Sequence, residues 1–273
     1  MESMLYYFGF GSNMSRLSLR AKGVEPKAST RAVLRGWRLR FNVQHFFRHE
    51  GGVGNIEHTG NPHDCVLGVL HHCTDEALPL LDQAEAYGHG YDRIEVVVQP
   101  GDRCAEDSPG ITAITYVGMP EFIDDRCLPS QRYLNIILQG GREAGLDANY
   151  LQTLASQPLH PVEDYPPFTP PPGDYPVFDR DSLAAQPLCT ALYGAVFDMS
   201  AARPLHTFMK GFLGGRDMTL FHLRRLDSSA LEENIDDIRH GRLNQAQKKY
   251  LNAYLNEYAR EYRYVGCYNY DND

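Results

Sequence analysis

The stretch YYFGFGSNM, residues 6–14, starts as an aromatic, β-prone run and breaks into glycine, serine and asparagine. This composition predicts a strand that ends in a tight loop. Gly9 and Gly11 carry no Cβ, so the backbone can turn and bring its N–H groups close to a ligand, while Ser12 and Asn13 add side-chain donors and can cap a helix. The loop predicts a cradle for a carboxylate or an oxyanion. An ordinary strand-to-helix connection is the alternative, and it is the commoner case for such a stretch alone.

A second informative stretch is LDQAEAYGHGYDRIEVVV, residues 81–98, where a helical tail meets a glycine turn and a β-branched strand. Thr74 or Asp75 is the expected N-cap, and the apolar spacing that follows places Glu85 in the last turn. A carboxylate is unfavourable at that end of a helix, because the partial charge there is negative, and this suits a general base that works near neutrality. A solvent-exposed glutamate is the alternative.

Two other carboxylates compete with Glu85 for this role. Glu95 alternates with Ile94 and Val96 in a predicted strand, so it is expected to be solvated or paired with arginine. Asp82 lies three residues before Glu85 and is expected to be a surface acid. Glu85 is therefore the favoured acid.

Together the two stretches resemble the γ-glutamylcyclotransferases, in which an aromatic-Tyr-Gly-Ser-Asn loop and a Leu-Asp-x-x-Glu-Gly helix end build one site. The resemblance covers about residues 5–157. Within it, residues 35–42 resemble the family's second strand, residues 51–56 with 66–70 its central hairpin, and residues 129–146 its terminal helix. The chain departs from the family pattern at Phe10, where tyrosine is usual, at Ala86, where glycine is usual, and in a shorter turn before Glu95.

The resemblance implies an α+β fold, a γ-glutamylcyclotransferase-like mixed β-barrel flanked by helices, in a catalytic domain over residues 1–157. It also implies an acyl-transfer-type lyase that works without a cofactor and without a metal. The α-amine of a γ-glutamyl amide closes a five-membered ring on the γ-carbonyl, and 5-oxoproline and an amine are formed. Glu85 would be the general acid/base. The implied substrate contacts are Tyr7, Gly9, Phe10, Gly11, Ser12, Asn13, Met14, Tyr91 and Tyr133, although Tyr91 and Tyr133 could equally be packing residues.

Two further hypotheses remain open. The first is γ-glutamylamine or γ-glutamyl-amide processing, by cyclisation or hydrolysis, in a specialised amine or natural-product pathway. The second is a non-catalytic module that binds a glutamyl-like anion. Glu85 counts against the second, because a carboxylate beside an anion pocket weakens anion binding unless it has another task.

Composition excludes several other classes. The 273 residues carry a net charge of −9 without a basic run, which argues against nucleic acid as a partner. No segment approaches the roughly 18 apolar residues of a membrane span, and the opening Met-Glu-Ser-Met has no signal-peptide character. Gly9 and Gly11 lack the third glycine of a dinucleotide fingerprint, and Ser12 lies outside a Gly-x-Ser-x-Gly motif. A cytoplasmic protein with no membrane partner is expected, and the resemblance implies a small γ-glutamyl substrate.

The cysteines and histidines predict no metal site. The six cysteines, at positions 65, 73, 104, 127, 189 and 267, are scattered and are expected to be reduced. His71, His72 and Cys73 are adjacent in a predicted strand and would point to alternate faces, which disfavours a shared metal.

The second half of the chain resembles no family that we recognise. Nine of the 17 prolines lie between residues 158 and 187, which predicts an extended connector. Residues 188–273 are expected to form an α/β C-terminal extension, with a strand over 188–198, a loop over 211–217 and an amphipathic, tyrosine-rich helix from Asn244, capped with Gln247, up to Gly266. Its tyrosines form either an interface, such as that of a homodimer, or the face that docks on the protein's own core, and docking is favoured.

Overall fold

The structure is a computed structural model that describes residues 3–101 and 109–272. The chain divides into two compact units. Unit 1 consists of Met1–His45 and Glu50–Pro161, and unit 2 consists of Phe46–His49 and Val162–Asp273. Each unit has hydrophobic clusters of its own. The mixed α+β composition of unit 1, a closed barrel with helices around it, agrees with the predicted fold class.

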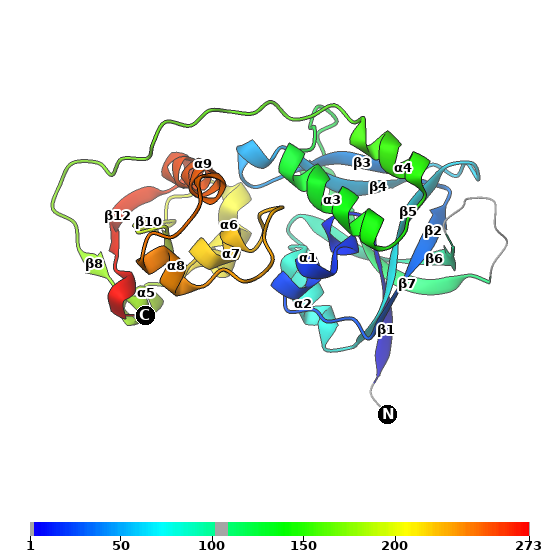
Figure 1. Ribbon diagram of the computed structural model, residues 1–273, viewed down its shortest axis with the longest axis horizontal. Coiled ribbons are helices and arrows are strands. Elements are labelled where there is room, and N and C mark those ends of the chain that lie inside the picture. The colour runs from blue at the N-terminus through cyan, green and yellow to red at the C-terminus, as the bar shows by residue number, and fades with distance from the viewer. Residues whose placement is uncertain (1–2, 102–108, 273) are drawn as a thin grey trace. The chain divides into compact units, whose positions relative to one another are not determined.

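Unit 1 is built on a closed barrel with the strand order β1-β5-β2-β6-β7 (Figure 1). The strands are β1 Met4–Gly9, β2 Ala28–Arg35, β5 Cys65–Thr74, β6 Tyr91–Pro100 and β7 Ile111–Gly118. Strand β5 pairs antiparallel with both β1 and β2. The barrel is completed by parallel pairing of β1 with β7 at Tyr7 and Ile114.

The predicted hairpin of residues 51–56 with 66–70 is wrong. Strand β4, Gly52–His58, pairs instead with β3, Trp37–Gln44, in a separate two-stranded sheet. The apolar run Val66–Leu70 is buried along its whole length, because it lies in a strand with neighbours on both edges. Residues 35–42 likewise span two strands, β2 and β3, which are separated by a turn at Gly36 with a φ of +76°.

The α-helices that the described residues of unit 1 form beside the barrel are α1 Arg16–Ala21, α2 Ala77–Ala84, α3 Gln131–Glu143 and α4 Ala148–Ala155. Helices α1 and α2 share a hydrophobic cluster that includes Leu19 and Leu81. Helices α3 and α4, green in Figure 1, share a cluster that includes Ile137 and Leu154. The helix predicted within residues 129–146 is confirmed as α3, although it is not the terminal one, since α4 follows it in unit 1. Ser130 caps α3 by accepting from the backbone N–H of Tyr133.

Two of the predicted helix caps are wrong. Ser12 to Met14 form a short 3-10 helix, and the cap of α1 is Ser15, whose hydroxyl accepts from the N–H of Ser18. Helix α2 begins after Glu76, whose side chain makes no capping hydrogen bond. Thr74 cannot be the cap, because it is still paired with Met4 in the barrel.

Unit 2 contains a five-stranded sheet with the order β11-β9-β10-β12-β8. The strands are β8 Val177–Phe178, β9 Cys189–Leu192, β10 Ala195–Asp198, β11 Arg216–Asp217 and β12 Arg263–Tyr268, and the helices are α5 Arg180–Ala184, α6 Thr207–Leu213, α7 Thr219–Leu223, α8 Ile235–Arg239 and α9 Gln245–Glu261. Strand β8 and helix α5 lie within the stretch predicted as an extended connector. The single strand expected over 188–198 is a hairpin that turns at Tyr193 and Gly194, and the loop expected over 211–217 contains the end of α6 and strand β11.

Helix α9 carries the tyrosines of the C-terminal stretch. Its predicted capping box is confirmed, since Asn244 and Gln247 each accept from the other's backbone N–H. The helix ends at Glu261 rather than continuing to Gly266, and the chain continues as β12. Tyr254 and Tyr258 are fully buried in unit 2, so these two tyrosines of the helix pack on the hydrophobic core of the same unit.

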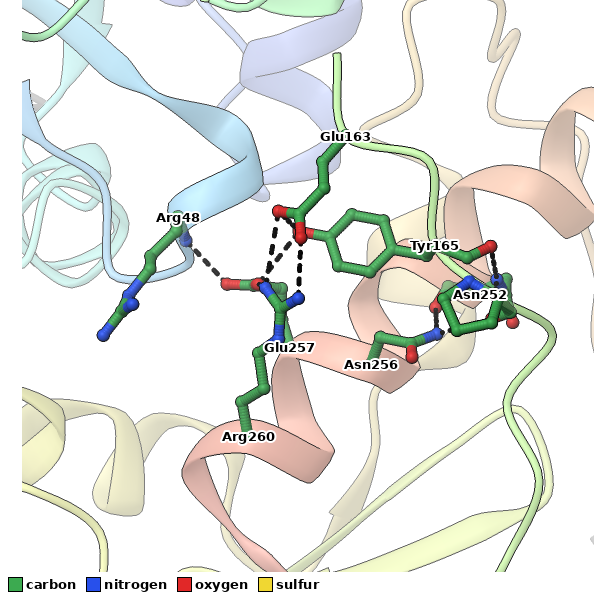
Figure 2. Close-up of polar contacts among 8 residues, drawn as sticks. Arg48, Glu163, Tyr165, Asn252, Asn256, Glu257 and Arg260 are labelled. Carbon is green, nitrogen blue, oxygen red and sulfur yellow. Dashed lines mark hydrogen bonds and ion pairs between the residues drawn. The ribbon is translucent and has the colours of Figure 1, made fainter. Parts of the chain in front are cut away.

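A buried carboxylate joins three segments of unit 2 (Figure 2). Glu257 on α9 accepts the backbone N–H of Arg48 at 2.7 Å, the hydroxyl of Tyr165 at 3.0 Å and the guanidinium of Arg260 at 2.9 Å. Its side chain is 2% exposed. Burial of a carboxylate is costly unless donors surround it, and here they come from Phe46–His49, from the proline-rich stretch and from α9 itself.

The expectation that the cysteines are reduced is wrong at Cys65, which is disulfide-bonded. Cys73, Cys127, Cys189 and Cys267 are free thiols, and Cys104 lies outside the described residues. Over residues 3–101 and 109–272, no helix has the length and apolar character needed to cross a membrane.

Candidate active site

The side chain of Asn13 lies at the centre of a polar network in unit 1. Its Nδ2 donates to the hydroxyl of Tyr7 at 2.6 Å and to Oε1 of Glu85 at 2.7 Å, and its Oδ1 accepts from the ammonium of Lys22. We call these four residues, Tyr7, Asn13, Lys22 and Glu85, the Asn13 network. The structure thus brings the glycine loop and the acid at the end of α2 together, although 72 residues separate them in the sequence.

Glu85 directly follows α2 and donates its backbone N–H to Leu81. The next residue, Ala86, has a φ of +51°, a conformation that glycine adopts without cost. This left-handed residue ends the helix and directs the chain toward β6. The side chain of Glu85 is 17% exposed, so its carboxylate is held by protein donors and still reaches the surface.

Lys22 is the member of the network that the sequence did not reveal. It is the residue after α1, and its Nζ lies 3.4 Å from Oε1 of Glu85. Only 12% of its side chain is exposed. An isolated lysine after a short helix carries no recognisable motif, so its position beside Glu85 becomes evident only in the fold.

His71, considered above only as an unlikely metal ligand, supports the loop from β5. Its Nε2 donates to the backbone carbonyl of Asn13 at 2.9 Å, and its Nδ1 accepts from the hydroxyl of Ser29 at 2.8 Å. Because a carbonyl can only accept, Nε2 must carry a proton, and Nδ1 is the acceptor when the ring is neutral. Burial lowers the pKa of His71 to about 4, which keeps the ring in that form at neutral pH.

Tyr133 and Tyr91 meet at the backbone of Gly54 in β4. The hydroxyl of Tyr133 accepts the N–H of Gly54 at 3.0 Å and also makes a backbone hydrogen bond with Ser12, while the hydroxyl of Tyr91 donates to the carbonyl of Gly54 at 2.6 Å. A Cβ at Gly11 would lie 2.8 Å from the Tyr133 oxygen, and one at Gly54 would lie 2.9 Å from it. Both glycines are therefore needed so that this hydroxyl can approach the backbone.

Burial raises the pKa of all three tyrosines around the loop. The pKa of Tyr133 rises to about 12, and those of Tyr7 and Tyr91 rise well above their ordinary value, with the charge of Glu85 as a further cause. At neutral pH all three are phenols, so each can donate a hydrogen bond.

The remaining predicted contacts serve the loop in different ways. Gly9 is needed for space, because a Cβ there would lie 3.0 Å from the backbone oxygen of Asn13. Gly9 and Gly11 do not have positive φ values, so close approach rather than an unusual turn accounts for both. The side chains of Phe10 and Met14 are buried in two hydrophobic clusters and anchor the loop to the core.

The competing acids lie in different surroundings. Asp82 is not a simple surface acid: its carboxylate accepts from Arg93 at 2.6 Å and from the hydroxyl of Tyr116 at 2.7 Å. These partners tie the end of α2 to β6 and β7. Glu95 is exposed on β6, as predicted.

We found no metal-binding arrangement among the described residues: no group of three or more histidine, cysteine, aspartate or glutamate side chains is placed to bind an ion. His71 and His72 stack against Tyr7 and Tyr6, respectively, at ring-centroid distances of 5.9 Å and 4.7 Å.

The closed five-stranded barrel, its flanking helices and the glycine loop at the end of β1 agree with the fold expected from the γ-glutamylcyclotransferase resemblance. Residues 65–154 match the model of the AIG2-like family. This match includes Glu85, Tyr91 and Tyr133, whereas the glycine loop lies before it.

Comparison with individual proteins agrees with this class. Gamma-glutamyl cyclotransferase aclK from Aspergillus oryzae is 27% identical over 180 residues, which cover 60% of this chain and 64% of that protein. The chain thus spans less than two thirds of this curated relative. A solved structure of an uncharacterized protein from Homo sapiens is 25% identical with a TM-score of 0.50, over 58% of this chain and 90% of that one.

A solved gamma-glutamyl cyclotransferase has 24% identity and a TM-score of 0.49, and the comparison covers 58% of this chain and 90% of that one. The predicted resemblance to γ-glutamylcyclotransferases is confirmed by the AIG2-like family match together with the relative from Aspergillus oryzae.

Proposed function

We propose that this protein is an enzyme of the γ-glutamylcyclotransferase type, which converts a γ-glutamyl amide into 5-oxoproline and releases an amine or an amino acid. The observation that carries the proposal is the 2.7 Å contact between Asn13 and Glu85, which holds a partly exposed carboxylate against the glycine loop. The resemblance to a gamma-glutamyl cyclotransferase from Aspergillus oryzae supports the same reaction class.

The reaction needs a proton carrier but no protein nucleophile. The free α-amine attacks the γ-carbonyl carbon, a C–N bond forms to close the five-membered ring, and the original amide C–N bond breaks. The attacking nitrogen starts as an ammonium and loses two protons, and the leaving nitrogen gains two. Glu85 carries these protons and ends in the state in which it began. The site holds the substrate folded, so that the amine and the carbonyl meet.

Negative charge develops on the γ-carbonyl oxygen during the attack, and the loop offers donors for it. The backbone N–H groups of Gly11 and Asn13 are the proposed donors, since the backbone of Ser12 is already hydrogen-bonded to the hydroxyl of Tyr133. The hydroxyl of Tyr133 accepts the N–H of Gly54, so its own proton can be donated toward the substrate. Asn13 orients Glu85 and is not itself the proton carrier.

The decisive experiment replaces the carboxylate while keeping its shape. Wild type and Glu85→Gln are incubated with γ-glutamyl amino acids, γ-glutamyl alkylamines and glutathione, and 5-oxoproline is measured by mass spectrometry. We expect product from wild type and a rate reduced by roughly 100-fold to 10,000-fold in the variant, because a proton carrier has been lost.

Glu95→Gln is the matched control, since Glu95 is an exposed glutamate in the same unit and should leave the rate unchanged. Equal activity of Glu85→Gln and wild type would refute the assigned role of Glu85. Free glutamate in place of 5-oxoproline would indicate hydrolysis, and no turnover by wild type would favour a binding module.

A further inference from the structure

A lysine beside the assigned proton carrier needs an explanation. Nζ of Lys22 lies 3.4 Å from Oε1 of Glu85 and donates to Oδ1 of Asn13. An ammonium next to a general base works against the removal of a proton, unless its charge has a second task. The lysine therefore adds something to the site that a proton carrier alone does not require.

The proposed substrate carries two opposite charges on a single carbon. The α-carbon of a γ-glutamyl compound bears an ammonium, which must reach Glu85, and a carboxylate, which needs a cationic partner. Lys22 and Glu85 present the complementary charges 3.4 Å apart, on side chains that are 12% and 17% exposed. Partly buried charges interact more strongly than fully solvated ones, because less water screens them.

Asn13 fixes the order of these two charges. Its Oδ1 faces the ammonium of Lys22 and its Nδ2 faces the carboxylate of Glu85, so a single amide side chain spaces and orients both groups. His71 in turn holds the backbone carbonyl of Asn13. Lys22 and Glu85 are thus both held by Asn13, a loop residue that is itself hydrogen-bonded to the barrel.

We propose that Lys22 binds the α-carboxylate of the γ-glutamyl substrate while Glu85 receives its α-ammonium. This inference rests on the proposed function and deepens it, since it restricts the substrates to compounds with a free α-amino acid head. The backbone N–H groups of the loop are then left to the γ-carbonyl oxygen.

Two substrates that differ only in the α-carboxylate test the proposal. γ-Glutamyl-L-alanine has this group, and 4-aminobutanoyl-L-alanine lacks it but can still cyclise, to 2-pyrrolidone. We expect wild type to prefer the first compound, and Lys22→Met to lower kcat/KM for it by about 10-fold to 100-fold, mainly through KM, as the loss of a charged hydrogen bond predicts. The activity of the variant on the second compound should change by less than about 3-fold, and Lys22→Arg should retain most of the preference.

The ratio between the two substrates makes the test insensitive to partial loss of folded protein. Lys27→Met, which removes an exposed lysine, should leave both activities unchanged. Equal losses on both substrates in Lys22→Met would overturn the proposal, because Lys22 would then act only on its neighbours in the protein.

Failure of the proposed function gives a different result. If wild type forms no lactam from either compound, binding of the two compounds is measured by calorimetry instead. A preference for γ-glutamyl-L-alanine that disappears in Lys22→Met would still support the carboxylate site. Equal binding of both compounds, or binding of neither, would overturn it.

Discussion

Gly11 lies so close to Tyr133 that an added methyl group would meet the tyrosine oxygen at 2.8 Å. We predict that Gly11→Ala lowers the free energy of unfolding by about 1–3 kcal/mol, the usual cost of overpacking. It should also lower kcat/KM, since a displacement of about 1 Å near reacting groups can reduce a rate by roughly 100-fold. Urea unfolding and the 5-oxoproline assay measure the two effects.

Tyr133→Phe provides the companion variant, because it removes the oxygen that the new methyl group would meet. The double variant Gly11→Ala, Tyr133→Phe should cost less than the sum of the two single changes. Strictly additive free energies would show that this contact is not the reason for a glycine at position 11.

His71 gives the folded state a specific pH dependence. Its pKa is about 4 in the folded protein and about 6.5 when unfolded, so the unfolded state binds more protons between these values. The contribution of neutral His71 to the free energy of unfolding is therefore fully present above pH 6.5 and is lost as the pH falls toward 4. About 2 kcal/mol of this contribution is lost at pH 5. Urea unfolding of wild type and His71→Gln at pH 7 and pH 5 measures it. A drop of the same size in the variant would assign the effect to other groups.

At this scale, local sequence signals revealed part of the site. Gly11 and Asn13 stand in a recognisable loop, and Glu85 stands at a recognisable helix end. Lys22 and His71 are 63 and 58 residues from their partners Glu85 and Asn13 and belong to no local pattern, so only the folded barrel brings them there.

Helix α3 approaches the loop closely at a glycine. A Cβ at Gly140 would lie 2.5 Å from the backbone nitrogen of Ser15 and 2.8 Å from the carbonyl carbon of Met14, and neither backbone can yield easily. We predict that Gly140→Ala is destabilising, since an overpacking cost of about 1–3 kcal/mol exceeds the gain of about 1 kcal/mol in helix propensity.

Gly211 in α6 is the matched control, because it is an exposed glycine in a helix with nothing within 4 Å of an added Cβ. Gly211→Ala should stabilise the protein by up to about 1 kcal/mol in the same unfolding measurement. Stabilisation by both substitutions would contradict the close approach assigned to Gly140.

Helices with local signals could be predicted, and strand partners could not. The cap Asn244 marked the start of α9 in the sequence, and Ser130 was recognised as the cap of α3 only in the structure. The partner of β4 was misassigned, because residues 66–70 pair with β1 and β2 in the barrel, whereas β4 pairs with β3 outside it. The turn at Tyr193 was missed since its φ of +45° is unusual for a tyrosine, and no Asn-Gly or Asp-Gly pair marks it.

At the scale of the whole molecule, unit 2 depends on a segment from the first half of the chain. Phe47 is 1% exposed, and its ring stacks on that of Tyr258 at a centroid distance of 5.1 Å. A fragment of residues 1–161 would expose this ring. We predict that the fragment aggregates and that Phe47→Ser restores a monomer, as measured by size-exclusion chromatography with light scattering.

Leu159→Ser is the control in the fragment, because Leu159 is already exposed in the full chain. It should not reduce aggregation. A monomeric fragment that retains Phe47 would show that the exposed ring is harmless.

The hydrogen bond between Arg48 and Glu257 joins residues that are synthesised at very different times. The two residues are 209 positions apart, so the ribosome makes Arg48 long before its partner. At about 5–20 residues per second the interval is roughly 10–40 s, far longer than local folding steps take. During this interval the nascent chain carries the Phe46–His49 segment without the α9 groups that bury it, so we expect the ring of Phe47 to stay exposed until α9 has been made.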